Sequence, residues 1–423
     1  MRLTSALDSV ARALTPDARI TVMTGAGVSA ASGVPTFRGA DGLWNRVRVE
    51  DLATPEAFAR DPCLVWEWYA WRRQLIAACE PNAAHHVLAD WSLRFPRLTL
   101  ITQNVDGLHE RAGASRVLGL HGSIWDVGCW RACGAAPHRW RDDTPAFAVL
   151  PPPCPHCGGP LRPGVVWFGE MLDSEVMDAS IAATACDVFL AIGTSAVVYP
   201  AAGLVDEARR HGALTVEINP ELTAASSTVD VSLAAPAEAA LPELDARLGP
   251  HPLALDTPRL RLMPVLPRDA RAMHQLWTDP DVRQYLWDGQ VIPLETAAAV
   301  ADASARDFSA HRFGLWSMHL GADPLTVVGF CGLRTEGIGD EPELLFGLRP
   351  AFWRQGLAVE AARAVLHHAF ESLGLARIVA ATDLPNERSA RTLASLGMRL
   401  ERRGEHHGLD TLFFSLHRPV AGG

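Results

Sequence analysis

Apolar and polar positions alternate through the first 250 residues in a way that predicts strands and helices in turn. Four short apolar runs, each ending in small or polar residues, predict buried strands at 18–27, 97–107, 186–195 and 213–221. Apolar residues at helical spacing predict helices between these strands. This alternation is typical of a doubly wound parallel sheet, a Rossmann-like α/β fold whose ligands bind beyond the carboxyl ends of the strands.

The pattern changes after a stretch rich in proline and glycine at 249–257. A new strand is predicted at 259–265, and helices and further strands follow it in the order expected of an α+β domain. Domain boundaries fall in exposed segments of this composition. We therefore predict two domains, at residues 1–250 and 256–420.

Composition limits the possible partners and compartment. The net charge of −10 argues against nucleic acid or an anionic membrane as the main partner. No apolar run approaches the roughly 18 residues of a membrane-spanning helix, and the first residues do not have the pattern of a signal peptide. We expect a cytoplasmic protein. All 38 basic residues are arginine, which either reflects genome composition or avoids offering an ε-amine to reactive acyl groups.

A glycine-rich turn follows the first predicted strand. Gly25 and Gly27 let the backbone approach a pyrophosphate, and a predicted helix start after them favours an anion. The spacing differs from G-x-G-x-x-G, so a purely structural turn is the alternative. Polar residues at the ends of other strands favour the dinucleotide interpretation; they are Gln103, Asn104, Asp106, His109 and His121.

Several segments together resemble the sirtuin NAD-dependent protein deacylases: GAGVSAASGVPTFRGADGLW, TQNVDGLH, LHGS, GVVWFGE, GTSAVVYP and INPE, in order and spacing, over about residues 7–248. The resemblance implies a set of NAD-binding residues. In the cofactor loop these are Gly25, Ala26, Gly27, Ser29, Thr36, Phe37, Arg38 and Trp44. Around the nicotinamide ribose they are Gln103, Asn104 and Asp106. Near the phosphate and the second ribose they are Gly193, Thr194, Ser195, Asn219 and Glu221, and Ala237 would lie over the adenine.

The resemblance also implies the reaction. His121 would be the general base that removes a proton from a ribose hydroxyl, a task suited to a histidine that titrates near neutrality. The partners would be acylated protein lysines, and the products deacylated lysine, nicotinamide and O-acyl-ADP-ribose. An NAD-consuming ADP-ribosyltransferase is the alternative for this domain.

Four cysteines lie in an inserted module at about residues 124–164. The pattern C-x3-C-x20-C-x2-C predicts a closed tetrahedral zinc site with a structural role, one zinc per chain. The first pair has three residues between its cysteines where the family more often has two, which could strain that turn; His138 and His156 are possible substitute ligands. The predicted ligands are Cys129, Cys133, Cys154 and Cys157, whereas Cys63, Cys79, Cys186 and Cys331 are predicted to be core residues.

The stretch W-E-W-Y-A-W-R-R-Q places Tyr69 and Arg72 at i and i+3, on one side of a predicted helix. In the desuccinylase-like branch of the sirtuins a Tyr-x-x-Arg pair binds the carboxylate of succinyl- or malonyl-lysine, and Thr36 fits that branch. Val166, Phe168 and Gly169 would complete the substrate site. The alternative is an amphipathic helix with its tryptophans packed inward and both Arg72 and Arg73 solvated.

The second domain resembles the GNAT acyl-CoA N-acyltransferases, particularly the branch that acts on ribosomal-protein N-termini, over about residues 256–417. The turn R-Q-G-L-A before an amphipathic helix suits a pyrophosphate. The implied acetyl-CoA-binding residues are Arg354, Gln355, Gly356, Leu357, Ala358, Glu360, Asn386 and Ser389.

The catalytic groups of this second domain are open. Leu393 stands where many members have a tyrosine acid, and Glu343 is either a general base or a solvated strand carboxylate. The amine acceptor is unknown: a protein α-amine, a lysine or a small molecule. A non-catalytic acyl-CoA sensor is therefore the alternative to an active N-acetyltransferase.

Overall fold

The computed structural model describes residues 3–36, 49–135, 137–195, 198–321, 323–335 and 337–419. The chain forms two compact units, Met1–Gly249 and Pro250–Gly423, and each is described here by itself.

The described residues of the first unit form a six-stranded parallel sheet with the order β3-β2-β1-β7-β8-β9. In chain order this is 3-2-1-4-5-6, the doubly wound dinucleotide-binding topology, so the predicted fold class is confirmed. β1 pairs in full register with β2 on one side and β7 on the other. The strands are β1 Ile20–Thr24, β2 Leu98–Thr102, β3 Val117–Gly119, β7 Val188–Ile192, β8 Leu214–Ile218 and β9 Val231–Leu233.

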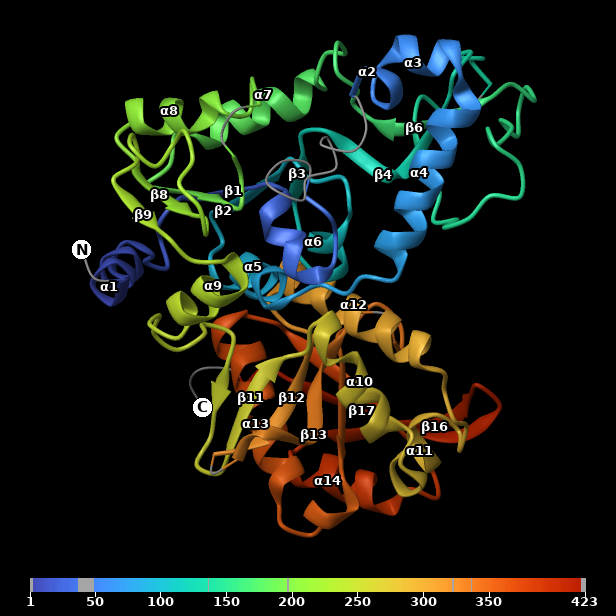
Figure 1. Cartoon of the computed structure of the whole chain (residues 1–423). Coiled ribbons are helices and arrows are strands. Elements are labelled where there is room, and N and C mark those ends of the chain that lie inside the picture. Colours follow the sequence, from blue (N-terminus) through green and yellow to red (C-terminus); the bar gives the residue numbers. More distant parts are fainter. Residues whose placement is uncertain are drawn as a thin grey trace. The chain divides into compact units, whose positions relative to one another are not determined.

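Helices cover both faces of this sheet (Figure 1). On one face α1 (Leu3–Ala13), α5 (Ala83–Arg94) and α9 (Ala237–Asp245) pack on one set of strand residues. On the other face α7 (Ser174–Ala183) and α8 (Gly203–Arg210) pack on the alternate set. Each strand is therefore buried on both sides, which is why the strands read as continuous apolar runs in the sequence.

A smaller module lies beside the sheet (Figure 1). Its three strands have the order β5-β4-β6, and two of its helices, α3 and α4, share one aromatic core with them. Asp61 caps α4 by accepting from Leu64 N–H, with Pro62 in the first turn where its missing donor costs nothing. The elements are α2 Val49–Leu52, α3 Pro55–Arg60, α4 Pro62–Ala77, β4 Gly122–Cys129, β5 Trp140–Arg141 and β6 Leu161–Val165, with the short α6 Leu108–Arg111 between sheet and module.

The second unit contains, among its described residues, an eight-stranded sheet with the order β10-β11-β12-β13-β14-β15-β17-β16. Its pairs are antiparallel except β14 with β15, which are parallel and meet at the single pair Glu343 and Val379. Within the described ranges, no other residues of these two strands pair with each other. The strands are β10 Leu255–Asp256, β11 Leu260–Pro264, β12 Leu315–Leu320, β13 Asp323–Arg334, β14 Glu343–Leu348, β15 Arg377–Asp383, β16 Arg399–His406 and β17 Leu409–His417.

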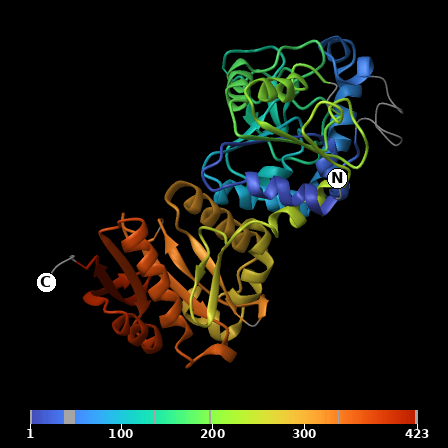
Figure 2. The same cartoon turned by 90° about the vertical axis from the view of Figure 1, so that its left-hand side faces the viewer.

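Helices lie on both sides of this second sheet (Figure 2). Those between β11 and β12 share one apolar core with Leu315, Phe330 and Leu345 of the strands. The other two follow β14 and β15 directly, as the sequence predicts. The helices are α10 Ala270–Trp277, α11 Pro280–Leu286, α12 Leu294–His311, α13 Leu357–His367 and α14 Glu387–Ser395.

Three glycines meet where the strand order of the first sheet reverses. Gly25 N–H donates to Ile192 O (3.0 Å) and Gly27 N–H donates to Gly193 O (2.8 Å), so the loops after β1 and β7 touch through their backbones. A Cβ on Gly193 would collide with the Val28 nitrogen, and one on Gly27 would lie 2.8 Å from the Gly193 Cα. No side chain fits here, so the two loops meet backbone to backbone at the usual binding edge of such a sheet.

The sequence prediction differs from the structure at this turn. The residues after Gly25 form a seven-residue 3₁₀ helix, Ala26–Ser32, in place of the expected α-helix start. The three-residue strands β3 and β9 were also not predicted, because three residues carry too little pattern to be recognised.

We predict that Gly193→Ala destabilises the chain and abolishes NAD binding. Gly212 is the control, since it has a φ of +84° and an added Cβ would meet nothing within 4 Å, whereas Gly193 has a φ of +58° and a backbone clash. Gly212→Ala should cost about 1–2 kcal/mol from the left-handed conformation alone. Gly193→Ala should cost about 1–3 kcal/mol more from overpacking. Equal losses in denaturant unfolding, with NAD affinity intact, would show that the contact between the loops is unimportant.

Candidate functional site

The loops that follow β2, β7 and β8 are tied together at the carboxyl edge of the first sheet. Gln103 Nε2 donates to Thr194 Oγ1 (2.9 Å), and Asn219 Nδ2 donates to Thr194 O (3.0 Å). Of the remaining predicted cofactor residues, Ser195 and Glu221 are exposed at this edge and Ala237 is buried at the start of α9. The structure thus brings the predicted residues of four separate segments to one edge. Phe37, Arg38 and Trp44 lie outside the described residues.

Ser29 is the centre of a buried polar network under this edge. Its hydroxyl donates to Asp106 Oδ2 (2.8 Å) and accepts from Asn104 Nδ2 (3.1 Å). Asp106 Oδ1 accepts from Leu108 N–H (2.9 Å). Burial raises the pKa of Asp106, while these hydrogen bonds and the charge of Arg72 oppose that rise. The carboxylate therefore holds Ser29 and the loop after β2 in one arrangement.

His85 completes the network and was not identified from the sequence. Its Nδ1 accepts from Asn82 N–H (3.3 Å), so the proton of the neutral ring lies on Nε2, which is 3.3 Å from Ser29 Oγ. Burial lowers the pKa of His85 to about 2 and that of His109, whose ring centroid lies 4.9 Å away, to about 4. Both rings stay neutral at physiological pH. The one signal in the sequence for a role of His85 is its position three residues after Asn82, where it takes part in capping the helix.

His121 lies on the same edge with a defined tautomer. Its Nδ1 is 2.9 Å from Gln103 O, and since a carbonyl oxygen only accepts, Nδ1 carries the proton. Nε2 is then the free lone pair. Burial lowers the pKa of His121, and the bond to Gln103 partly opposes this. The ring is therefore a neutral base near pH 7, held by the same residue that binds Thr194.

α4 presents Tyr69 and Arg72 on one side, and both side chains are buried. Trp167 Nε1 donates to the Tyr69 hydroxyl oxygen (3.0 Å), which leaves the hydroxyl hydrogen to donate elsewhere. The Arg72 guanidinium lies 5.0 Å from the Trp68 ring centroid. Burial raises the pKa of Tyr69 to about 12 and lowers that of Arg72, while their mutual electrostatic interaction opposes both shifts.

Arg73, the next residue, points into the inserted module. It is fully buried and donates to Ile124 O (2.7 Å), Thr144 O (2.9 Å) and the carboxylate of Asp142 (3.1 Å). The alternative of a helix with two solvated arginines is therefore wrong. The tryptophans are also not all in the core, because Trp66 is fully buried whereas Trp71 is 44% exposed.

The four module cysteines form one cluster. Their sulfur atoms all lie within 4.8 Å of one another, and neither His138 nor His156 belongs to the group. A tetrahedron with Zn–S bonds of about 2.3 Å needs sulfurs about 3.8 Å apart, so the donor set fits zinc. Ala132 lies between Cys129 and Cys133 in the longer first turn and has a φ of +45°. This left-handed conformation is strained for alanine, as expected for a turn with one more residue than usual between its cysteines. Of the four other cysteines, Cys63 is exposed rather than in the core; its position in the first turn of α4 turns it outward.

The second unit contains a cleft of about 1750 Å³. It opens where β14 and β15 separate, and all of the predicted CoA residues except Gln355 and Glu360 line it. Gly356 caps α13 with a φ of +73°, and Asn386 caps α14 by accepting from Ser389 N–H (3.2 Å). Leu393 also lines the cleft and is buried.

Two carboxylates near this cleft are engaged by arginines. Glu343 is 3% exposed and accepts from Arg334 Nε (2.7 Å), so the interpretation as a solvated strand carboxylate is wrong. Glu360 accepts from Arg259 Nε (2.7 Å), and Arg259 Nη1 donates to Gln355 O (2.8 Å). Glu360 therefore positions an arginine that braces the turn before α13. Arg259 was not identified from the sequence, because only the fold brings it beside this turn.

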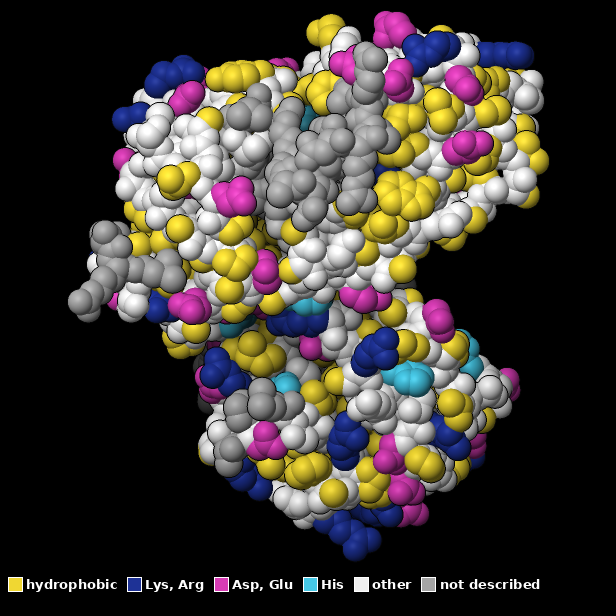
Figure 3. All heavy atoms as spheres, in the orientation of Figure 1, with side chains coloured by type: hydrophobic (Ala, Val, Ile, Leu, Met, Phe, Trp, Pro, Cys, Tyr) yellow, Lys and Arg dark blue, Asp and Glu magenta, His cyan; other side chains and the backbone are white. Residues whose placement is uncertain are grey.

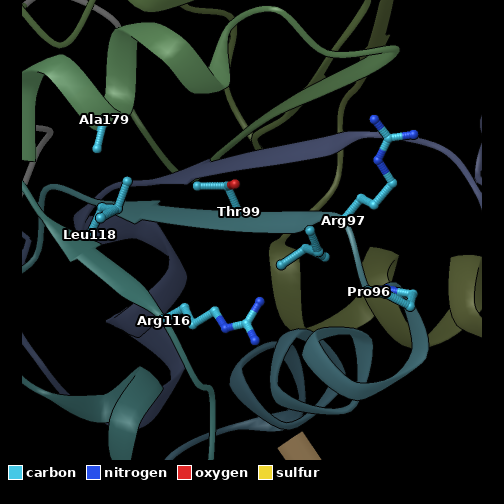
Figure 4. A pocket seen from close by; sticks show the side chains of 7 residues that line it. Pro96, Arg97, Thr99, Arg116, Leu118 and Ala179 are labelled. Carbon is cyan, nitrogen blue, oxygen red and sulfur yellow. The ribbon is translucent and has the colours of Figure 1, made fainter. Parts of the chain in front are cut away.

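A smaller hollow of about 320 Å³ lies at the amino end of β2, away from the carboxyl edge, between β2, β3 and α7. Figure 4 shows that the two arginines in its wall, Arg97 and Arg116, point in different directions. They do not form a converging anion site.

The first unit is thus a dinucleotide-binding α/β core with a zinc-type module. The chain belongs to the Sir2 family, whose match covers residues 25–200, and it carries an acetyltransferase (GNAT) domain that matches residues 259–399. No helix within the described ranges is long and apolar enough to cross a membrane.

Curated relatives support this membership. An "NAD-dependent protein deacylase" of Aquifex aeolicus (strain VF5) is 52% identical over 213 residues, which are 50% of this chain and 87% of that protein. "NAD-dependent protein deacylase 2" of Pyrobaculum aerophilum is 49% identical over 56% of this chain and 93% of its own length. A solved Sir2 homologue–NAD complex is 44% identical, with a TM-score of 0.51, and covers 57% of this chain and 91% of that one.

We predict that Ala132→Gly stabilises the zinc-loaded chain. Relief of the left-handed alanine is worth about 1–2 kcal/mol, and the added freedom of the unfolded chain offsets about 0.4–1 kcal/mol. Ala135→Gly is the control, since Ala135 is outside the cysteine pair and is not among the residues with positive φ. The expected result is one zinc per chain and a rise in thermal midpoint for Ala132→Gly alone. A rise that persists after chelation would contradict a metal-bound origin of the strain.

Proposed function

We propose that the first unit removes acyl groups from protein lysines with NAD as co-substrate. The observation that carries this proposal is the pairing of a backbone cradle, formed by Gly25, Gly27 and Gly193, with a neutral histidine base at the same edge. The names of the relatives, NAD-dependent protein deacylases, support it. When bound, NAD supplies an electrophilic ribose carbon and nicotinamide as leaving group.

The chain's residues have distinct tasks in this proposal. The three glycines let the pyrophosphate lie close to the backbone of this edge, because no Cβ intervenes. The Ser29, Asn104 and Asp106 network fixes the nicotinamide side of the site. His121 Nε2 accepts the proton of a ribose hydroxyl, and Gln103 O stabilises the imidazolium that results by accepting from Nδ1.

The proposed partner is an acylated protein, and a suitable surface lies on the module that contains Tyr69 and Arg72. Hydrophobic side chains gather on the face of the module over α4 (Figure 3). The exposed ones in this region include Leu64, Trp71 and Phe168. The zinc site would hold the module in shape, since four protein ligands leave no open position for chemistry.

The proposed acyl preference is for succinyl and malonyl groups. Tyr69 and Arg72 are buried together on one side of α4, so a guanidinium and a phenol hydroxyl are close enough to act on one group. An acyl carboxylate would accept from the guanidinium and from the tyrosine hydroxyl. Acetyl-lysine has no carboxylate and would not form these bonds.

We propose acyl transfer from acetyl-CoA to an amine for the second unit. The cleft between the diverging strands, with helix starts at Gly356 and Asn386, supports acyl-CoA binding. Thr382 lies in its wall with a buried hydroxyl that has no partner in the described residues, and it could bond an amide of the pantetheine arm. The buried Glu343, whose carboxylate accepts from Arg334, is a better candidate for binding than for accepting a proton.

The first experiment is mass spectrometry of the NAD products formed with acetyl-, succinyl- and malonyl-lysine peptides. We expect nicotinamide and O-acyl-ADP-ribose from the native chain, and from His121→Ala no turnover with NAD binding retained. Since burial lowers the pKa of His121, kcat/KM should fall only as the pH drops below about 6.5, where the base becomes protonated. ADP-ribose formed without an acyl peptide would favour an ADP-ribosyltransferase, and full activity of His121→Ala would refute the base.

The acyl preference is tested by Arg72→Met. We expect the rate of desuccinylation to fall about 100-fold, because two charge-assisted hydrogen bonds to the acyl carboxylate are lost. The rate of deacetylation should be largely retained, since an acetyl group does not form these bonds. Arg73→Met is the matched comparison on the same helix, and it should lower the thermal midpoint and reduce both activities together. A proportional loss of both activities in Arg72→Met, at unchanged stability, would show that Arg72 does not select the acyl group.

A further inference from the structure

Trp167 lies just after β6 and contacts Tyr69 of α4, which is 98 residues earlier in the chain. Its indole Nε1 is 3.0 Å from the Tyr69 hydroxyl oxygen, and the two side chains are 2% and 3% exposed. An indole N–H can only donate, so the Tyr69 oxygen accepts in this bond. A buried donor from another segment therefore occupies one side of the phenol oxygen.

The hydroxyl hydrogen of Tyr69 must point away from Trp167, because the indole and hydroxyl hydrogens repel each other. Nothing in the part of the chain that the structure describes accepts this hydrogen. Burial raises the pKa of Tyr69 to about 12, so the hydroxyl keeps its hydrogen at physiological pH. Buried donors without an acceptor are uncommon in native proteins, and this one indicates an oxygen atom of a ligand.

Arg162 and Glu170 hold the Trp167 ring in place. The guanidinium carbon of Arg162 lies 3.9 Å from the ring centroid, within the range of a cation–π contact. Arg162 Nη2 donates to Glu170 Oε2 (2.9 Å), and the same oxygen accepts from Trp167 N–H (2.8 Å). One ion pair thus fixes both the face of the indole and the backbone that carries it.

The backbone on either side of Trp167 is fixed as well. Val166 N–H donates to His121 O (2.9 Å), and Phe168 N–H donates to Ala53 O (2.9 Å). The direction of the indole N–H is therefore set by contacts in which Tyr69 takes no part. It follows that the tryptophan orients the tyrosine hydroxyl, and not the reverse.

We propose that Trp167 is a positioning residue that turns the Tyr69 hydroxyl to donate to the carboxylate of a succinyl- or malonyl-lysine. The inference rests on the proposed acyl preference and adds a residue outside the Tyr-x-x-Arg pair. Without the indole N–H, the phenol could turn its hydrogen toward the vacated side and present a lone pair to the carboxylate. An oxygen–oxygen repulsion would then replace a hydrogen bond. Acetyl-lysine, which has no carboxylate, would not experience this change.

The test variant is Trp167→Phe, which keeps an aromatic ring beside Arg162 and removes the N–H. The full chain is assayed with NAD and with succinyl- and acetyl-lysine peptides of one sequence. We expect the ratio of desuccinylation to deacetylation in kcat/KM to fall about 10-fold, mostly through KM of the succinyl peptide, as for a hydrogen bond to a charged group. The matched control is Trp130→Phe, in the same aromatic core with its ring centroid 6.3 Å from that of Trp167, and it should leave the ratio unchanged.

A double-mutant cycle separates positioning from a structural role. If Trp167 acts through the hydroxyl, Trp167→Phe lowers the ratio in the native chain and has no further effect on it in the Tyr69→Phe background. A merely structural tryptophan would lower both activities and the thermal midpoint together and leave the ratio as it was. An unchanged ratio in Trp167→Phe, or a further loss of ratio in the double variant, overturns the inference.

The inference and the proposed acyl preference fail in different ways. Desuccinylation by the native chain that does not depend on Trp167 overturns the inference alone. Absence of desuccinylation overturns the proposed preference, and calorimetry with the two peptides, without NAD, then decides the inference. Weaker binding of the succinyl peptide by Trp167→Phe, with no such effect in the Tyr69→Phe background, upholds the inference, and any other result overturns it.

Discussion

The contact on which the first unit depends is backbone against backbone, between the loops after β1 and β7. Gly27 N–H donates to Gly193 O at 2.8 Å, and there is no room for a side chain on either residue. Because these loops meet directly, Thr194 falls within reach of Gln103 and Asn219. Gln103 in turn fixes the tautomer of His121. The position of the proposed base is therefore a consequence of how closely two backbones pack.

The hydrogen bonds of the polar side chains under this edge define which atom donates and which accepts in each pair. Ser29 donates to one carboxylate and accepts from an amide and an imidazole, which uses its full capacity. His85 and His109 remain neutral because burial disfavours their charged forms. A network that does not titrate near neutrality keeps its geometry while His121, at the edge, is free to change its protonation.

The sequence predicts this first unit well where a feature depends on residues close together in the chain. The strand ends, the four cysteines and the shared side of Tyr69 and Arg72 follow from local spacing, and the structure has the strands and the cysteine cluster as expected. Features made by distant segments were missed. His85 reaches Ser29 across 56 residues, and Arg259 reaches Gln355 across 96, so nothing in the neighbouring sequence marks either one.

The same limit explains the errors. Glu343 is the first residue of its strand and follows Glu341 and Pro342, a position where a carboxylate is commonly solvated, and its burial depends on Arg334 of the adjacent strand. Cys63 lies in an apolar stretch, yet its helix turns it to the surface. Burial of a polar side chain and exposure of an apolar one are both decided by partners that arrive from elsewhere in the fold.

Arg72 and Arg73 are neighbours in the chain with unrelated surroundings, one beside Tyr69 and the other bonded to the module through Ile124 and Asp142. A helix turns about 100° per residue. Insertion of one residue before them in α4 would therefore carry Arg72 into the surroundings of Arg73 and turn Arg73 away from both sites, while leaving the composition of the helix almost unchanged. A sequence alignment that places a gap within this helix would therefore pair Arg72, the residue proposed to select the acyl group, with the wrong position of a relative.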